Sequence, residues 1–280
     1  MKTCKGIDVV SFGEILWDVI EGVPHLGGAP FNFAAHCALC GLKTAMVSSV
    51  GDDDLGRRAR EMAHGYGVDI SGVNIHPTLP TGTVLVSLKD GIPSYDIRTG
   101  VAWDEIAVSD AFLAQPCPRA VYFGTLVQRS SVSAATLKRT SDAWSDAEVF
   151  FDVNLRQSYW SKALVEEGLG RATVLKLNDE EQVTLGVDPM KAFAAHPRLK
   201  IVIVTKGADG CEIFLRDGTS FASPAEPAGP VVDTVGAGDA FSAAFLSAYL
   251  QGATPQEAAH AGNVRGGFVA SRAGAIPVET

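Results

Sequence analysis

The sequence predicts an α/β protein whose mostly parallel sheet is covered by helices on both faces. Two observations carry this prediction: short apolar runs rich in β-branched residues, and longer segments between them whose apolar residues recur at helical spacing. Parallel neighbours in a sheet need crossover helices, so the alternation indicates a buried parallel sheet. The predicted strands are Ile7–Phe12, Ala45–Val50, Ala120–Gly124, Glu148–Val153, Thr173–Leu177 and Lys200–Thr205.

Two helices are marked by their end signals. The first keeps one apolar face until Gly67, where the helix is expected to end. That face consists of Leu55, Ala59, Met62, Ala63 and Tyr66. The second helix begins at Thr254-Pro255-Gln256-Glu257, a capping box with proline at the first helical position, and is expected to run to about Arg272.

Two further segments depart from the alternation of strands and helices and predict a second, smaller sheet. Thr83–Leu88 alternates apolar and polar residues, turns at Asp90-Gly91 and returns through Ile92–Arg98. This pattern is typical of a hairpin with one face in water. Glu14–Glu21 is an extended piece that leaves the first strand, and we expect it to join the hairpin in a sheet that stands off the main one.

The composition is that of a soluble globular enzyme, with 46% hydrophobic and 20% charged residues in a chain of 280. We expect a single domain of residues 1–280, into which the small-sheet segments at about 14–24 and 82–100 are inserted. The 23 basic and 32 acidic residues give a net charge of -9 without a basic run. This balance disfavours a nucleic-acid partner or an anionic membrane surface.

The five scattered cysteines suit a reducing compartment. Cys37 and Cys40 have the spacing of metal ligands, but no second pair or histidine couple completes a site, so they are interpreted as core thiols. Gly6 and Asp8 interrupt any apolar core of a signal peptide, and Phe241–Leu250, the longest nearly apolar stretch, is too short to span a bilayer. A cytoplasmic protein without a membrane partner is therefore expected.

The most informative segment is residues 233–241, Asp-Thr-Val-Gly-Ala-Gly-Asp-Ala-Phe, which follows Ala222–Pro230, an expected loop. The glycines bend the backbone into a helix, whose free N–H groups and dipole form an anion site that a bulky anion can approach closely. Asp239 adds a carboxylate in the first turn. A lone aspartate would be only a good residue for a helix start, but the whole segment suggests phosphoryl transfer to a hydroxyl.

The same nonapeptide closely resembles the D-T-x-G-A-G-D signature of the ribokinase-like (pfkB) sugar kinases. Other segments resemble the family's motifs in the family's order, so the resemblance extends from about Val9 to Pro277. These segments are Gly13–Asp18, Gly27–Asn32, Val50–Asp53, Ala102–Asp104 and Asp152–Arg156. The Gly-Gly-Ala-Pro-x-Asn pattern at 27–32 is similar to fructokinases, whereas ribokinases more often carry Gly-Gly-Lys-Gly-x-Asn.

The resemblance implies a ribokinase-like three-layer α/β/α domain, with the small sheet as a lid, and an ATP- and Mg²⁺-dependent sugar kinase. It makes Asp239 the general base, beside an anion hole formed by Gly236, Ala237 and Gly238. The implied substrate-binding residues are Asp18, Gly28, Asn32, Arg98, Asn154 and Arg156. The implied nucleotide-binding residues are Asn178, Thr205, Gly207 and Asn263.

Two cation sites are implied as well. Glu181 would order Mg²⁺ through water, because this ion usually keeps several waters and few carboxylates. The Asp233 carboxylate and the Val235 carbonyl resemble half of the family's K⁺ site, whose other half comes from carbonyls near 272–274. The sequence leaves open whether K⁺ binds there.

Several of these residues also have a simpler interpretation. Asp18 could be a solvent-facing strand residue and Asn32 a turn residue, and a lone arginine such as Arg98 is usually solvated. Glu181 could be a surface acid in the first turn of a helix, and residues 205–210 could form a plain β-turn.

The leading hypothesis is phosphorylation of fructose on a primary hydroxyl, and ribose and 2-keto-3-deoxygluconate are alternative acceptors. A non-catalytic sugar-binding protein on the same scaffold is a distant alternative. A dinucleotide-dependent oxidoreductase is disfavoured, because Phe241 stands where the third glycine of Gly-x-Gly-x-x-Gly belongs. Exposed apolar faces of a lid often pair with another subunit, so a homodimer through the lid is expected.

Overall fold

The computed structural model describes residues 6–89 and 92–277. Its main sheet has nine strands in the order β13-β12-β11-β10-β9-β8-β1-β4-β5. Neighbours from β11 to β5 pair in parallel, and β12 pairs antiparallel with both β11 and β13. The strands are β1 Val9–Phe12, β4 Thr44–Gly51, β5 Asp69–His76, β8 Ala120–Gly124, β9 Glu148–Asp152, β10 Val174–Asn178, β11 Ile201–Thr205, β12 Cys211–Leu215 and β13 Ser220–Ser223.

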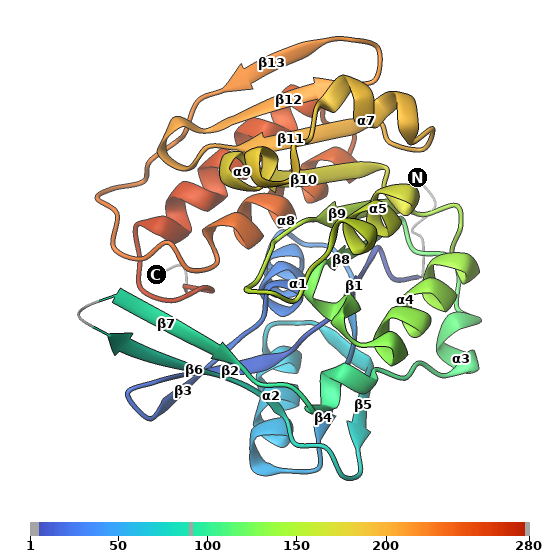
Figure 1. Ribbon diagram of the computed structural model, residues 1–280, viewed down its shortest axis with the longest axis vertical. Coiled ribbons are helices and arrows are strands. Elements are labelled where there is room, and N and C mark those ends of the chain that lie inside the picture. Colours follow the sequence, from blue (N-terminus) through green and yellow to red (C-terminus); the bar gives the residue numbers. More distant parts are fainter. Residues whose placement is uncertain (1–5, 90–91, 278–280) are drawn as a thin grey trace.

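Helices cover both faces of this sheet (Figure 1). They are α1 Ala29–Leu39, α2 Asp54–Gly65, α3 Asp110–Leu113, α4 Ser131–Ala143, α5 Lys162–Arg171, α6 Asp179–Leu185, α7 Pro189–Ala195, α8 Ala237–Leu250 and α9 Pro255–Ala270, with 3-10 turns η1 Ala102–Glu105, η2 Leu126–Arg129 and η3 Gly207–Asp209. Successive strand residues point to opposite faces, so Val10 packs in the cluster with α4, α5 and α7, whereas Val9 packs with α1, α8 and α9. The predicted three-layer α/β/α architecture is confirmed.

The second sheet has four strands in the order β3-β2-β6-β7 and stands off the main sheet at the lower left of Figure 1. Its strands are β2 Leu16–Ile20, β3 Val23–Gly27, β6 Gly82–Lys89 and β7 Ile92–Ile97. β2 pairs in parallel with β6 and antiparallel with β3. We call this sheet the lid. Its outer apolar residues include Ile20, Val23 and Leu85, which are 44%, 55% and 36% exposed.

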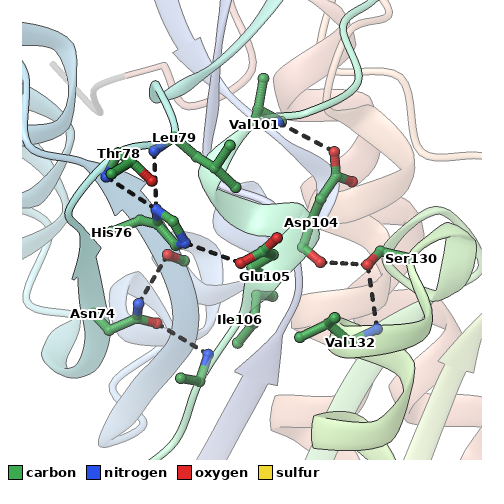
Figure 2. Close-up of polar contacts among 12 residues, drawn as sticks. Asn74, His76, Thr78, Leu79, Val101, Asp104, Glu105, Ile106, Ser130 and Val132 are labelled. Atoms are coloured by element: carbon green, nitrogen blue, oxygen red, sulfur yellow. Dashed lines mark hydrogen bonds and ion pairs between the residues drawn. The ribbon is translucent and has the colours of Figure 1, made fainter.

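The chain that leaves the lid is fastened to the main domain through η1 (Figure 2). The Asp104 carboxylate accepts backbone N–H bonds from Gly100 and Val101, at 2.9 and 3.3 Å. His76 Nδ1 accepts the backbone N–H groups that follow it, so Nε2 carries the proton and donates to Glu105 at 3.1 Å. These contacts fix the segment that follows β7, where the chain leaves the lid, to β5.

The end of β7 has two more anchors. Arg129 donates to the Arg98 carbonyl at 2.6 Å, and the Tyr159 hydroxyl donates to the Ile97 carbonyl at 3.0 Å. The Arg129 guanidinium also pairs with Asp104 at 2.8 Å. The returning strand is therefore held by side chains from η2 and from the segment after β9.

The six predicted strands and both predicted helices are found, with ends that differ by a few residues; the last helix ends at Ala270 rather than near Arg272. The expected loop Ala222–Pro230 is wrong at its start, because β13 continues through Ser223. The predicted turn at Asp90-Gly91 lies outside the described residues. Cys37 is buried, as expected of a core thiol, but Cys40 is only partly buried at the end of α1.

The sequence analysis also missed β3, β5, β12 and the crossover helices α4 to α7 as separate elements. Among the described residues, no helix combines the length and the apolar character needed to cross a bilayer.

Candidate active site

The segment before α8 forms an open turn at the helix N-terminus. Gly236 is the N-cap, with φ at 76°, and it has no side chain to cap the first-turn N–H groups. Asp233 holds the turn in place by accepting from the Val235 and Gly274 N–H groups, at 3.0 and 3.1 Å. The exposed N–H groups and the helix dipole favour an anion here.

Asp239 lies in the first turn of α8 and meets Asn32 of α1. The Asn32 side-chain amide donates to the Asp239 carboxylate at 2.8 Å. Burial raises the pKa of Asp239 to about 6, and the hydrogen bond from Asn32 opposes this shift. Asn32 is 5% exposed, and its amide oxygen has no hydrogen-bond partner among the described residues. The pair therefore joins a carboxylate to an amide whose oxygen is buried without a partner among the described residues.

Arg156 is shared by three carboxylates that converge from different elements. Burial raises the pKa of Glu14 to about 7 and that of Asp18 to about 6, while the charge of Arg156 lowers both. Arg156 also lowers the pKa of Asp239. This side of the site is therefore rich in carboxylates relative to cations.

The approach to these carboxylates depends on two glycines between β3 and α1. A Cβ at Gly27 would lie 2.5 Å from the Asp18 carboxylate, and one at Gly28 would lie 2.6 Å from the Glu14 carbonyl. Gly28 also has φ at 105°, which side-chain-bearing residues rarely adopt. Asn154 has φ at 41°, so the turn that leads from β9 to Arg156 is left-handed as well. Both turns hold the backbone in place for the side chains beside them.

Beneath the α8 turn lies a buried ion pair of Lys176 and Asp152. The Lys176 ammonium lies 3.1 Å from both carboxylate oxygens of Asp152. One of these oxygens, Oδ2, also accepts from the Tyr122 and Ser242 hydroxyls, at 3.3 and 3.2 Å. Burial would lower the pKa of Lys176, but the charges of Asp152, Glu181 and Asp239 together more than offset this effect, and the pKa is raised. A Cβ at Gly238 would lie 3.3 Å from the ammonium, so the lysine sits directly under the anion site.

Asn178 and Glu181 cap the N-terminus of α6 together. The Asn178 side chain accepts from the Glu181 N–H at 2.7 Å, and the Glu181 carboxylate accepts from Asn178 at 2.9 Å and from Leu155 at 2.7 Å. Glu181 is 8% exposed, so the simpler interpretation as a surface acid is wrong. Burial raises its pKa, with a further contribution from the nearby Asp152.

The other predicted nucleotide residues lie around the end of β11. Thr205 ends this strand, and Gly207 starts η3 with φ at 55°. Asn263 of α9 is 7% exposed and donates to the carbonyls of Ser223 and Pro224, at 3.1 and 2.9 Å. Its amide hydrogens therefore already hold the end of β13. Arg98, a predicted substrate residue, is exposed at the end of β7.

The site thus collects at the carboxyl ends of β1, β9, β10 and β11, the edge where open α/β sheets bind ligands. Glu14 and Lys176 were missed by the sequence analysis. A lysine inside the otherwise apolar strand Thr173–Leu177 was a usable signal, because a buried lysine needs a carboxylate partner.

The arrangement fits a nucleotide better than a resident metal. Among residues 6–89 and 92–277, no cluster of three or more histidine, cysteine or acidic side chains could hold a metal ion. The glycine turn, the α8 N–H groups and the buried lysine instead offer donors and positive charge to a phosphate chain. A divalent cation would then be held mainly by phosphate and water, with Glu181 nearby.

Curated relatives with different substrates resemble this chain. It is 29% identical to 2-dehydro-3-deoxygluconokinase of Thermoproteus tenax over 251 residues, which cover 84% of this chain and 76% of that protein. It is 28% identical to fructokinase-1 of Oryza sativa subsp. japonica over 305 residues, which cover 96% of this chain and 93% of that one.

Solved structures share the fold. The uncharacterized sugar kinase PH1459 of Pyrococcus horikoshii, solved in complex with ATP, matches with a TM-score of 0.83 and 25% identity over 95% of this chain and 93% of that one. The sequence itself matches the profile of the pfkB family carbohydrate kinases over residues 4–280. This chain therefore belongs to the pfkB family of carbohydrate kinases and is a sugar kinase.

Proposed function

We propose that this protein transfers the γ-phosphoryl group of ATP to the primary hydroxyl of a free, uncharged sugar, with fructose as the leading acceptor. The observation that carries the proposal is the Asn32–Asp239 pair at the N-terminus of α8. It joins a carboxylate whose pKa is about 6 to a turn that favours anions. A base of this pKa is ionised at neutral pH and can still accept a proton in the transition state.

In the proposed mechanism, Asp239 takes the proton from the sugar hydroxyl as that oxygen attacks phosphorus in line with the leaving oxygen. The N–H groups of Gly236, Ala237, Gly238 and Asp239 bind the charge on the transferring group. Asn32 orients the Asp239 carboxylate and offers its free oxygen to a neighbouring sugar hydroxyl. ATP with Mg²⁺ supplies the phosphoryl group and neutralises part of its charge.

The nucleotide and cation roles are proposed as follows. Asn178, Thr205 and Gly207 lie along the ends of β10 and β11 and bind ATP, and the side-chain oxygen of Asn263 contacts adenine. Glu181 orders Mg²⁺ through water, because its carboxylate oxygens already accept from backbone N–H groups.

A K⁺ site is proposed beside the α8 turn. It would use the Asp233 carboxylate and the Val235 carbonyl. The proposal is supported by the bond from the Gly274 N–H to the Asp233 carboxylate at 3.1 Å, because it brings the segment near 272–274 to this turn.

Electrostatics favour a neutral acceptor. Glu14, Asp18 and Asp239 all lie near Arg156, whereas the other nearby cations, Arg129 and Lys176, are already paired with Asp104 and Asp152. A sugar acid or a phosphorylated sugar would therefore meet like charge there. We assign the sugar hydroxyls to Asp18, Gly28, Asn32, Asn154 and Arg156, with Arg98 reaching the site when the lid closes. Ribose remains a second neutral candidate, and the acid 2-keto-3-deoxygluconate a third, supported by the relative of that activity.

The test is an ADP-release assay with fructose, ribose and 2-keto-3-deoxygluconate, in which kcat/KM is compared for each. We expect fructose to give the highest value and the acid the lowest. A higher value for the acid would overturn the neutral-acceptor argument. The non-catalytic alternative would be supported if the wild-type protein bound a sugar but released ADP no faster than the Asp239→Asn variant.

We also propose that the chain is one domain that works as a cytoplasmic homodimer, with the lids of two copies in contact. The support is the exposed apolar surface of Ile20, Val23 and Leu85 on neighbouring lid strands. Sedimentation of Val23→Lys should show a monomer if this surface is the interface.

A further inference from the structure

His36 is a buried histidine that the proposed mechanism does not use. It lies on α1 one turn after Asn32 and is 0% exposed. Its Nε2 is 2.9 Å from the Ala275 carbonyl, and its Nδ1 is 3.3 Å from both Nε and Nη2 of Arg265. One imidazole thus connects α1, α9 and the segment that follows α9.

The partners of His36 determine its tautomer. A guanidinium can only donate, so Nδ1 must accept from Arg265. Nε2 therefore carries the proton and donates to the Ala275 carbonyl. Burial, followed by the nearby Arg265 charge, lowers the pKa of His36 to about 4 against the opposing effect of the carbonyl, so the ring is neutral.

The carbonyl that His36 holds lies against the anion-site turn. A Cβ at Gly236 would lie 2.8 Å from the Ala275 oxygen and 2.6 Å from the Ala275 Cβ. The preceding residue, Gly274, donates to Asp233 at 3.1 Å. Ala275 is therefore fixed from one side by His36 and forms the surface on which Gly236 rests.

We propose that His36 is a positioning residue that holds the Ala275 carbonyl against Gly236 and so keeps the N-terminus of α8 in the geometry that binds the transferring phosphoryl group. The assignment of the anion site rests on the proposed function, but the mechanical link between His36 and Gly236 does not. α1 then supports the α8 turn in two ways: Asn32 bonds directly to the base, and His36 acts on the backbone donors through Ala275.

Two substitutions separate the contacts of His36. In His36→Gln, the side-chain Nε2 can still reach and donate to the Ala275 carbonyl. In His36→Asn, an oxygen near the former Nδ1 can accept from Arg265, but nothing reaches Ala275. Misplacement of donors by about 1 Å costs about a hundredfold. We expect His36→Asn to lose about ten- to a hundredfold in kcat, with sugar KM within about threefold, and His36→Gln to retain most of kcat.

Hydrogen exchange of the ligand-free protein provides a second readout. Amides 236–239 should exchange faster in His36→Asn than in His36→Gln, whereas β11 should be unchanged. His196→Gln is the matched control, because His196 pairs with Glu166 at 3.3 Å at the far end of α7. If His36→Asn fails to fold, Ala275→Gly in its place loosens the backbone whose carbonyl His36 holds, and the same amides should exchange faster than in wild type.

Equal kcat and equal exchange in the Gln and Asn variants would overturn the positioning role. So would a loss confined to the melting temperature, because a merely structural histidine would lower stability without changing kcat of the folded enzyme. A wild-type protein without turnover on any sugar would instead refute the proposed function, and the exchange experiment would still decide the role of His36.

Discussion

The side-chain amide of Asn32 donates a 2.8 Å hydrogen bond to the carboxylate of Asp239, although 207 residues separate the two in the chain. This bond favours the ionised carboxylate, whereas burial favours the protonated one and raises the pKa to about 6. The balance leaves the base ionised at neutral pH and protonated in acid. Activity should therefore fall as pH decreases through about 6.

In Asn32→Ala, the fall in activity at acidic pH (the acidic limb of the pH profile) should begin at higher pH. The reason is that the hydrogen bond that opposes the raised pKa of Asp239 is lost. The measurement is the pH dependence of kcat/KM for the sugar at saturating ATP, compared with wild type. Asn74→Ala, which removes an amide on β5 bonded to Ser49, is the control and should leave the limb in place. An unchanged limb in Asn32→Ala would show that the hydrogen bond does not set the pKa.

Asp239→Asn should lower kcat by about 10²–10⁴, the usual effect of removing a positioned general base. ATP affinity should change little, since the backbone donors of α8 survive the substitution. Steady-state kinetics and calorimetric titration with ATP test the two statements separately. Near wild-type turnover would mean that another group accepts the proton.

Asp18→Asn should raise the KM for the sugar by about ten- to a hundredfold and leave the KM for ATP within about twofold. The reason is that Asp18 lies on the lid strand β2, away from the ends of β10 and β11. Initial-rate kinetics with each substrate varied in turn give both constants. Parallel changes in the two constants would indicate a structural role.

Gly236→Ala should abolish most activity because a methyl group would meet the Ala275 backbone at 2.7 Å. The turn must then shift, which should cost about a hundredfold in kcat. Gly218→Ala is the matched control: φ is 91° there, but a Cβ would meet nothing within 4 Å. Both variants should lose about 1–2 kcal/mol of stability from the left-handed backbone. Only Gly236→Ala should lose kcat, and equal kinetics in the two would exclude the steric argument.

Fructose should slow hydrogen exchange in β6 and β7, because the closed lid excludes water from the phosphoryl group. Asp104 and Arg129 already hold the segment that follows β7 in place, so the added protection should be largest on the strands rather than on Gly100 and Val101. ATP alone should have a smaller effect. Protection spread evenly over β11 as well would indicate general stabilisation by the ligand instead of closure.

The sequence predicted the parts of this fold that follow from local pattern. The strand ends carrying Asp152 and Asn178 were found because apolar runs stop there. β5 and β13 were missed because polar residues occupy these edge strands and their hydrogen bonds come from neighbours distant in sequence. Patterning within one segment cannot report such pairing.

The site shows the same limit. The nonapeptide at 233–241 located the α8 turn, but the ion pair beneath it depends on β9 and β10 lying side by side. His36 likewise gains its partners, Arg265 of α9 and the Ala275 carbonyl, only in the folded chain, and Glu14 is buried near Arg156 and Asp239, which are distant in sequence. Asn263 matched a family position, yet its amide hydrogens hold the end of β13, a contact that sequence spacing cannot reveal.

The two adjacent glycines between β3 and α1 have a consequence for how the enzyme treats ATP when no sugar is bound. The Asp18 carboxylate occupies the space that a side chain at Gly27 would need, and the helix that begins just after Gly28 carries Asn32 to Asp239. Binding of the sugar at Asp18 and orientation of the Asp239 carboxylate therefore both depend on the backbone at Gly27 and Gly28. With no sugar present, this backbone lacks the ligand that would tighten it. We expect the enzyme to hydrolyse ATP only slowly when it is left alone with water, so that little nucleotide is lost in futile turnover.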